Sequence, residues 1–352
     1  MASASLSEGK EGADAVLVVG PSWVGDMVMA SALFQTLRAQ RPNVAIDVLA
    51  PAWSLPLLER MPEVRHGIEM PVGHGRLALG TRWRLARSLR GRYGQAIVLP
   101  GSLKSALIPA WAGIARRTGY RGEHRWGLIN DMRRLDPATM PLMVQRYAAL
   151  GLETGASQGT APAPRPRLGV DPANQQRLLT RLKLSPNRPV VALLPGAEFG
   201  PSKQWPAEHY AALARALRAA DVEVWVLGSA KDAAVGTEIT NQAPGTVNLC
   251  GQTTLVDAVD LIALAQACVS NDSGLMHVAA ALDVPLWALF GSTSPEHTPP
   301  LSDQARVIRL GLTCSPCFKR VCPLGHKRCL ADLAPQPIAS AILERLAGRL
   351  PA

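Results

Sequence analysis

Glycine-rich loops that follow short apolar runs carry the residues best suited to chemistry. The first apolar run, Ala15–Val19, leads into residues 20–26, which end in the carboxylate of Asp26. A turn of this kind, from a buried strand into a helix, is where α/β sheets bind anionic ligands. It contains neither the G-x-G-x-x-G fingerprint nor a P-loop, so it predicts neither of those two nucleotide sites. Asp26 is then either a general base at the end of the strand or only the N-cap of a helix that begins at Met27.

Polar residues that suit a diphosphate follow three expected strands in the second half of the chain. Residues 195–206 contain Ser202 and Lys203, a hydroxyl and an ammonium donor just before a helix. Residues 226–229 end in Gly-Ser, which lets a nucleotide approach the backbone. In residues 270–277 a carboxylate stands at a strand end, a Ser-Gly pair opens the next helix and a histidine follows one turn later: Asp272, Ser273, Gly274 and His277. Because parallel strands end at one sheet edge, the three loops together predict a diphosphate pocket, although each alone fits an ordinary cap or turn.

The elements that must hold these loops alternate between strand and helix. In the first half, strands are predicted at residues 15–19, 44–49 and 95–99, with helices after the first loop, at 55–60 and at 81–90. In the second half, strands are predicted at 189–194, 222–227, 268–270 and 285–290, with helices at 208–219 and 255–267. This alternation predicts a parallel α/β sheet in each half.

Two such halves imply two domains. Residues 155–170 are rich in Pro, Gly and Ala without periodicity, which is typical of a linker. We therefore expect a disordered lead-in over residues 1–14, one nucleotide-binding-like domain over 15–165 and a second over 166–352. The natural site of such a pair is the cleft between the two domains.

Composition excludes several classes of protein. The 352 residues are 47% hydrophobic and 18% charged, so the chain is neither disordered nor fibrous. It has no run of about 18 apolar residues, the length that a membrane-spanning helix needs. Its N-terminus lacks the apolar core of a signal peptide. These features predict a cytoplasmic protein.

The positive charge is concentrated in one window. The chain carries a net charge of +10, and residues 76–134 alone carry thirteen Lys or Arg against two acids. Positive charge concentrated in one window predicts a polyanionic partner. This partner could be a phosphorylated substrate, an anionic membrane surface or nucleic acid. The alternative is that these arginines only decorate solvated helix faces.

The six cysteines fall into two groups. Cys250 and Cys268 stand in apolar surroundings and are expected in the core. A C-x2-C-x4-C-x6-C cluster near the C-terminus comprises Cys314, Cys317, Cys322 and Cys329. Such a cluster in a cytosolic protein is more often a metal site than a disulfide framework, but its spacing differs from the paired C-x2-C of a zinc ribbon. Zinc, a redox pair and loop packing all remain open, and we expect no metal.

Taken together, these motifs resemble the bacterial ADP-heptose:lipopolysaccharide heptosyltransferases, and the cysteine tail resembles the type II enzymes of that family. The resemblance extends from about residue 15 to 346 and rests on VVGPSWVGDMVMA, VLPGSLKSALIPA, TGYRGEHRWGLIND, LLPGAEFGPSKQWP, NDSGLMHVAAAL and CSPCFKRVCPLGHKRCL. It implies a GT-B fold, with two Rossmann-like parallel-sheet domains facing each other across a cleft, and a glycosyltransferase that needs no cofactor or metal. The implied reaction moves L-glycero-D-manno-heptose from ADP-heptose to the first heptose of the lipopolysaccharide inner core, with inversion.

The resemblance also implies roles for individual residues. It makes Asp26 the catalytic base and Lys203 the contact of the donor phosphate and sugar. The donor-binding loop of the family is matched by Asp272, Ser273, Gly274 and His277. Ser102 and Lys104 are expected to face the acceptor, which is the phosphorylated inner core and lipid A. The basic window would then serve peripheral contact with the anionic inner membrane at its cytoplasmic face, and no nucleic acid is expected.

Other functions compete with this interpretation. A type I heptosyltransferase would use the heptose-free Kdo-lipid A acceptor. A GT-B-like sugar-nucleotide epimerase shares the architecture but needs two acid/base groups around one sugar carbon, and only Asp26 is a clear candidate. A nucleic-acid- or membrane-binding protein would use the basic window, yet aromatic residues make up only 5% of the chain and no nucleic-acid motif is present.

Overall fold

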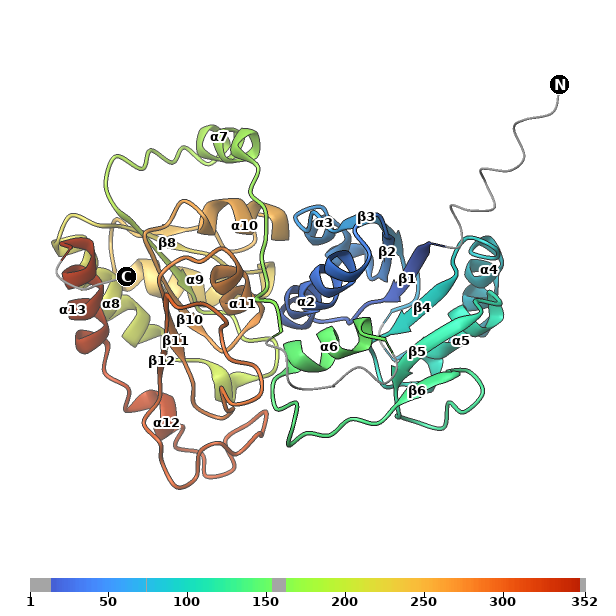
Figure 1. Cartoon of the computed structure of the whole chain (residues 1–352). Coiled ribbons are helices and arrows are strands. Elements are labelled where there is room, and N and C mark those ends of the chain that lie inside the picture. The colour runs from blue at the N-terminus through green and yellow to red at the C-terminus, as the bar shows by residue number, and fades with distance from the viewer. Residues whose placement is uncertain (1–13, 74, 154–162, 349–352) are drawn as a thin grey trace. The chain divides into compact units, whose positions relative to one another are not determined.

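The computed structural model describes residues 14–73, 75–153 and 163–348, which form two compact units that divide between Pro166 and Arg167. Each unit contains its own six-stranded sheet (Figure 1). All but the last residue of the expected lead-in 1–14, and the first half of the expected linker 155–170, lie outside the described residues.

The sheet of the first unit is parallel throughout, with the strand order β3-β2-β1-β4-β5-β6. Its strands are β1 (Ala15–Val19), β2 (Ala45–Ala50), β3 (Val64–Glu69), β4 (Gln95–Val98), β5 (Arg116–Tyr120) and β6 (Asp131–Arg133). Its helices are α2 (Val24–Gln40), the 3-10 turn η1 (Ala52–Ser54), α3 (Leu55–Leu58), α4 (Leu79–Ser88), α5 (Leu103–Trp111) and α6 (Met143–Gly151).

The second unit repeats this topology. Its strands are all parallel, in the order β12-β11-β10-β7-β8-β9. If β7 is counted as the first strand, this is the order of the first sheet read from the opposite edge. Its strands are β7 (Val190–Leu194), β8 (Glu223–Val226), β9 (Val247–Asn248), β10 (Ala267–Asn271), β11 (Leu286–Leu289) and β12 (Ala305–Ile308). Its helices are α7 (Pro172–Arg181), α8 (Ala207–Ala219), α9 (Ala233–Gln242), α10 (Leu255–Ile262), α11 (Gly274–Ala281), α12 (Arg328–Ala331) and α13 (Pro335–Leu346), with the 3-10 turns η2 (Pro201–Lys203) and η3 (Ala230–Asp232).

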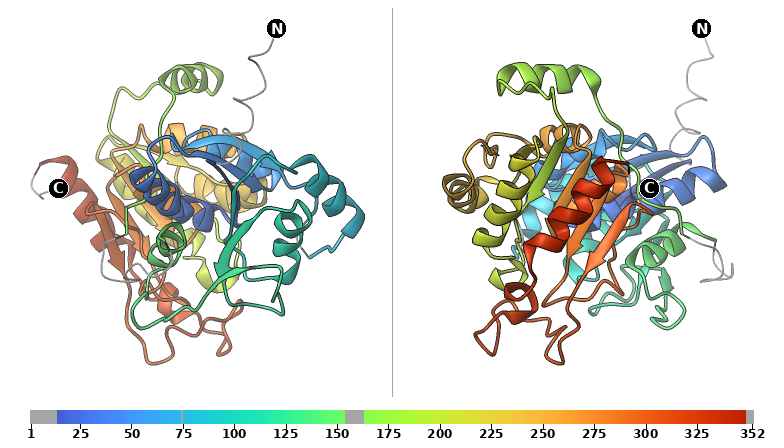
Figure 2. Two further views of the ribbon diagram at one scale, coloured as in Figure 1. Left: turned by 45° about the vertical axis from the view of Figure 1, so that its right-hand side comes forward. Right: turned by 90° about the vertical axis from the view of Figure 1, so that its left-hand side faces the viewer.

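Both sheets have the order of a doubly wound Rossmann-like fold, which confirms the predicted α/β class. The central strands are nearly continuous apolar runs because helices cover both of their faces, and every residue of β1 and β7 is buried. In the second unit α13 packs beside α8 (Figure 2). Cys250 and Cys268 are buried there, as expected.

The structure corrects the expected start of the first helix. α2 begins at Val24, and Trp23 is its N-cap, with extended backbone angles and no side-chain cap hydrogen bond. The first turn is closed by the Met27 N–H, which donates to the Trp23 carbonyl at 2.9 Å. Asp26 is therefore the third residue inside the helix, and the interpretation of Asp26 as an N-cap is wrong.

Several elements were not predicted. β3 and β6 are the edges of the first sheet, and the exposed or half-buried side chains of β3 leave no apolar pattern to detect. β5 begins with two arginines and also lacks an apolar run. Conversely, α3 ends at Leu58 and α10 at Ile262, both earlier than expected. No helix within the described residues is long and apolar enough to cross a membrane.

Candidate functional site

The ends of β7 and β10 bring together two residues that are 69 positions apart in the chain. The Lys203 Nζ lies 2.6 Å from Asp272 Oδ2, and the exposed fractions of the two side chains are 15% and 8%. The Thr293 hydroxyl donates to the same carboxylate oxygen at 2.5 Å. Both members of this buried pair were predicted as donor-binding residues, whereas Thr293 was not recognised because no motif surrounds it. The carboxylate thus fixes the position of the Lys203 ammonium.

Asn271 holds the Lys203 loop against the sheet. This fully buried residue accepts hydrogen bonds at Oδ1 from the Trp205 backbone N–H and the Tyr210 hydroxyl, both at 3.1 Å. Its Nδ2 donates to the Pro195 carbonyl at 2.6 Å. Three segments are thereby fastened to the last residue of β10. A buried amide in an otherwise apolar strand was the available sequence signal, since such a group needs partners.

The start of α11 lies directly after Asp272, as predicted. Ser273 is the N-cap in extended conformation, and its hydroxyl makes no cap hydrogen bond. Gly274 is the first helical residue, so the N–H groups of this turn belong to the orphan donors of a helix N-terminus. The arrangement supplies uncharged donors beside the Lys203 ammonium.

His277 lies in the first turn of α11 and is buried. Burial, opposed by the Asp272 carboxylate and aided by the Lys203 ammonium, lowers the pKa of His277 to about 4. The imidazole is therefore neutral near pH 7 and can donate one hydrogen bond and accept one.

Ser202 is placed differently from the expectation that its hydroxyl faces a ligand. Its side chain is buried, and Oγ donates to the Lys319 carbonyl at 2.5 Å and lies 3.1 Å from the Ser292 Oγ. Its backbone N–H donates to the Arg320 carbonyl at 3.2 Å. The Ser202 hydroxyl thus fastens the Lys203 loop to the cysteine-bearing segment, and this geometry does not support direct donor binding by Ser202.

The loop that ends in Gly228-Ser229 also differs from expectation. Asp232 accepts hydrogen bonds from the Ser229 N–H at 2.8 Å and the Ser229 hydroxyl at 2.7 Å. A Cβ added at Gly228 would lie 2.8 Å from the Asp232 Cβ, and one added at Gly196 would lie 2.9 Å from its Oδ2. The space that the glycine leaves beside the backbone is filled by Asp232, a residue that the sequence analysis did not single out.

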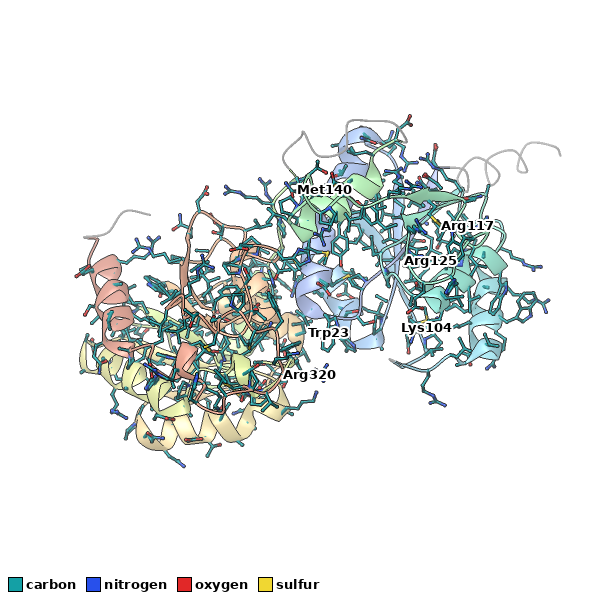
Figure 3. All side chains as sticks on the ribbon, turned by 90° about the horizontal axis from the view of Figure 1, so that it is seen from below. Trp23, Lys104, Arg117, Arg125, Met140 and Arg320 are labelled. Atoms are coloured by element: carbon teal, nitrogen blue, oxygen red, sulfur yellow. The ribbon has the colours of Figure 1, made fainter. Side chains whose placement is uncertain are left out.

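A cavity of about 600 Å³ opens in the first unit at the ends of its central strands. Ser102 and Lys104, the two expected acceptor residues, line it together with Trp23 and Trp53. Both tryptophans are about half exposed, at 48% and 45%. Trp23 and Lys104 are marked in Figure 3, where they lie along the same side of the first unit. The cavity combines apolar faces with a cation, a combination suited to a charged sugar.

Asp26 lies in α2, three residues after Trp23, which lines this cavity. Its side chain is half-buried, and it is not among the residues that line the cavity. Burial raises the pKa of the Tyr147 hydroxyl, and the charge of Asp26 raises it further, which places the carboxylate close to α6. The structure therefore keeps Asp26 near, but not in, the lining that contains Ser102 and Lys104.

Several arginines of the basic window are buried and stabilise the fold. Arg125 and Arg133 are buried and donate to backbone carbonyls, for example from Arg133 to Ala149 at 2.6 Å (Figure 3 marks Arg125). Arg82 is buried as well, donates to the Leu77 carbonyl at 2.7 Å and lines the cavity. These side chains are not available to a membrane surface, so only part of the predicted basic field faces solvent.

α4 and the residues next to it carry part of the exposed charge. Its solvent-facing arginines are Arg84, Arg87 and, just after the helix, Arg90. Trp83, which is 43% exposed, packs edge-on against Trp111 at 5.7 Å, and the Arg90 guanidinium lies 5.5 Å from the Trp83 ring. Leu77 and Leu79 are about half exposed beside it. We refer to Leu77, Leu79, Trp83, Arg84, Arg87 and Arg90 as the α4 face. It combines apolar and cationic side chains, as interfacial helices do.

Comparison with known proteins agrees with this architecture. A sequence model described as Glycosyltransferase family 9 (heptosyltransferase) matches residues 82–328. Lipopolysaccharide heptosyltransferase 2 of Salmonella typhimurium is 50% identical over 333 residues, covering 92% of this chain and 96% of that protein. Lipooligosaccharide heptosyltransferase 2 of Haemophilus influenzae is 52% identical over 306 residues, covering 84% of this chain and 88% of that protein.

The fold comparison gives the same result. The structure of Escherichia coli ADP-heptose lps heptosyltransferase II superimposes with a TM-score of 0.85 at 47% identity, covering 94% of this chain and 99% of that chain. This similarity confirms a GT-B-type glycosyltransferase fold and disfavours both the epimerase and the non-enzymatic binding protein. The chain belongs to glycosyltransferase family 9, the heptosyltransferases.

Proposed function

We propose that this enzyme transfers L-glycero-D-manno-heptose from ADP-heptose to the first heptose of the lipopolysaccharide inner core, by an inverting single displacement. The observation that carries the proposal is the 50% identity, over 92% of this chain and 96% of the relative, to a protein named lipopolysaccharide heptosyltransferase 2. The buried Lys203–Asp272 pair at the start of α11 agrees with it, because a departing diphosphate needs fixed positive charge.

On the donor side, Lys203 is the residue that we assign to the diphosphate. Its ammonium is held by Asp272 and lies beside the N-terminal amides of α11 at Ser273 and Gly274. Charge that develops on the leaving ADP meets these donors, which are already in place and need no reorganisation. Neutral His277 adds a hydrogen bond without adding charge.

On the acceptor side, Asp26 is the proposed base. An acceptor hydroxyl attacks the anomeric carbon and gives its proton to the Asp26 carboxylate, while the bond from that carbon to the ADP oxygen breaks on the opposite face. Ser102 and Lys104 are proposed to bind the acceptor, since both line the cavity of the first unit. Tyr147, whose pKa is raised mainly by burial, stays protonated beside Asp26 and does not compete as a base.

The acceptor is anchored in a membrane, and the α4 face is the proposed contact with it. Its exposed arginines suit anionic headgroups, at about 1 kcal/mol for each well-placed side chain. Its exposed leucines and tryptophan suit the interface between headgroups and acyl chains. Peripheral binding at the cytoplasmic face of the inner membrane would bring the cavity to its substrate.

Transfer to defined acceptors tests the proposal. Purified enzyme is given ADP-heptose and inner-core acceptors that carry zero, one or two heptoses, and the products are identified by mass spectrometry. We expect one heptose to be added only to the acceptor that already carries one. Use of the heptose-free acceptor alone would identify a type I enzyme and refute the type II assignment.

A further inference from the structure

The C-terminal cysteines are brought to one place by the fold. Cys314, Cys317, Cys322 and Cys329 are all free thiols and are each partly exposed. All four line the same small cavity of about 20 Å³, together with His326. The two remaining cysteines of the chain lie in the core, so the grouping is specific to this loop.

The segment between β12 and α12, residues 309–327, has no helix or strand of its own. Its largest apolar side chains point outward, with Phe318, Val321 and Leu324 between 61% and 68% exposed. Burial of apolar surface therefore does little to hold it. Loops longer than about 12–15 residues without secondary structure are uncommon in compact domains and are usually functional when they are ordered.

The four cysteines line one cavity, although their sulfur atoms do not yet have the spacing of a metal site. Backbone N–H groups of Leu324, Gly325, His326 and Lys327 hydrogen-bond to Cys322, which makes a concave turn of donors around its sulfur. Cys329 lies close enough to each of the other three thiols to interact with them electrostatically. Turns of successive N–H groups around a sulfur recur at protein metal centres.

We propose that Cys314, Cys317, Cys322 and Cys329 bind one thiophilic divalent metal ion, Zn²⁺ or Fe²⁺, as a structural tetrathiolate site. Four thiolate ligands select these ions over Mg²⁺ or Ca²⁺. Within the described residues no three possible ligands already have the spacing of a metal site, so binding must draw the four sulfurs together. The side chains of the loop are largely exposed, which leaves room for this adjustment. This proposal replaces the expectation that the cluster holds no metal.

The loop that carries these cysteines touches the Lys203 loop directly. The Lys319 and Arg320 carbonyls accept hydrogen bonds from Ser202, and a Cβ at Gly200 would lie 2.6 Å from the Arg320 carbonyl oxygen. The centre of the Phe199 ring lies 5.1 Å from the Lys203 Nζ and 5.6 Å from the Arg320 guanidinium, so this ring contacts both loops. The metal would thereby hold Lys203 in position for Asp272. Only this last effect depends on the proposed function.

Metal analysis of the full-length protein tests the site. The protein is produced in media supplemented with either Zn²⁺ or Fe²⁺, purified with a phosphine reductant and assayed by elemental analysis. We expect about one ion of Zn²⁺ or Fe²⁺ per chain, released as four thiols are titrated with an organomercurial, which forms an S–Hg bond with each of them. The two media show which ion is preferred.

Two variants make the test specific. Cys317→Ser is expected to lose most of the metal, whereas Cys250→Ala, which removes a buried thiol outside the cluster, is expected to keep it. ADP affinity should fall several-fold in the first variant and stay unchanged in the second. Wild-type protein with four freely reactive thiols and no metal would overturn the proposal in favour of simple packing. Wild-type protein whose four thiols are consumed in two disulfides would overturn it equally. Neither result depends on whether heptose is transferred.

Discussion

Replacing Lys203 by methionine should damage both stability and donor binding, and the two effects can be separated. The substitution leaves the Asp272 carboxylate buried, with its side chain 8% exposed and its ammonium partner at 2.6 Å removed. Breaking one side of a buried ion pair typically costs about 3–5 kcal/mol. The Thr293 hydroxyl still donates to the same oxygen at 2.5 Å, so we expect the lower part of that range, about 3–4 kcal/mol.

The effect of Lys203→Met on donor binding differs in size from its effect on stability, and a second substitution should not reverse it. A hydrogen bond from a charged donor to a phosphate contributes about 1.5–3 kcal/mol, which corresponds to a loss of ADP affinity of about 10- to 150-fold. The double variant Lys203→Met/Asp272→Asn removes the uncompensated carboxylate. It should recover about 1–2 kcal/mol of the lost stability without recovering ADP affinity.

Calorimetric unfolding and titration with ADP, carried out on the wild type, both single variants and the double variant, complete the cycle. Thr293→Val serves as the matched control, because it removes a partner of the same carboxylate without removing a charge. If the double variant regained the affinity for ADP, Lys203 would act only by keeping the fold in place. If Lys203→Met were as stable as the wild type, the pair would not be a buried ion pair in solution.

Three further predictions concern other parts of the molecule. Asp26→Asn should fold and bind ADP-heptose but lose about 10²–10⁴-fold in turnover. Asn is nearly isosteric with Asp, and the carboxylate in the first turn of α2 favours the helix dipole, so a loss of about 1 kcal/mol in stability is expected. A stable variant with normal turnover would remove Asp26 from the mechanism. Transfer should survive EDTA, because Lys203 and the α11 amides stabilise the charge of the departing diphosphate. A loss of activity that Mg²⁺ rescues would contradict this prediction. A loss that only Zn²⁺ rescues, together with a lowered melting temperature, would point to the cysteine site. Replacing the three arginines of the α4 face by serine should weaken binding to vesicles of anionic lipid while ADP affinity stays constant, and an equal loss of ADP affinity would refute the division of roles.

The stability of the first unit should depend on pH through Asp47. Burial by itself would raise the pKa of this carboxyl, but hydrogen bonds from Arg65 and Tyr93 outweigh burial and leave the pKa lowered. A lowered folded-state pKa contributes stability that is present above the unfolded-state value of about 4 and is lost as the pH falls through the folded-state value. Asp47→Asn should therefore flatten the acid limb of the melting-temperature profile. An unchanged acid limb would show that Asp47 does not drive it.

Local sequence patterns by themselves determined the strands and loops at the centre of each unit. β1, β7, β10 and β11 are short apolar runs ended by Gly, Pro or polar residues, and burial on both faces requires such runs in any parallel sheet. The start of α11 after Asp272 was equally predictable, because Ser and Gly are favoured at helix starts. The edge strands β3 and β6 were not, since a half-solvated edge needs no apolar pattern.

Only the tertiary structure decided which side chains meet. Lys203 pairs with Asp272 because β7 and β10 are neighbours in the sheet. The sequence of neither loop predicts this strand order. The Ser202 hydroxyl likewise donates to the carbonyl of Lys319, which lies 117 residues later in the chain. Among arginines that look alike in the sequence, Arg82 is buried and Arg84 is exposed, because helix periodicity turns them to different faces. Residue types and their spacing are local properties, whereas partners, burial and charge compensation arise only when distant segments pack together.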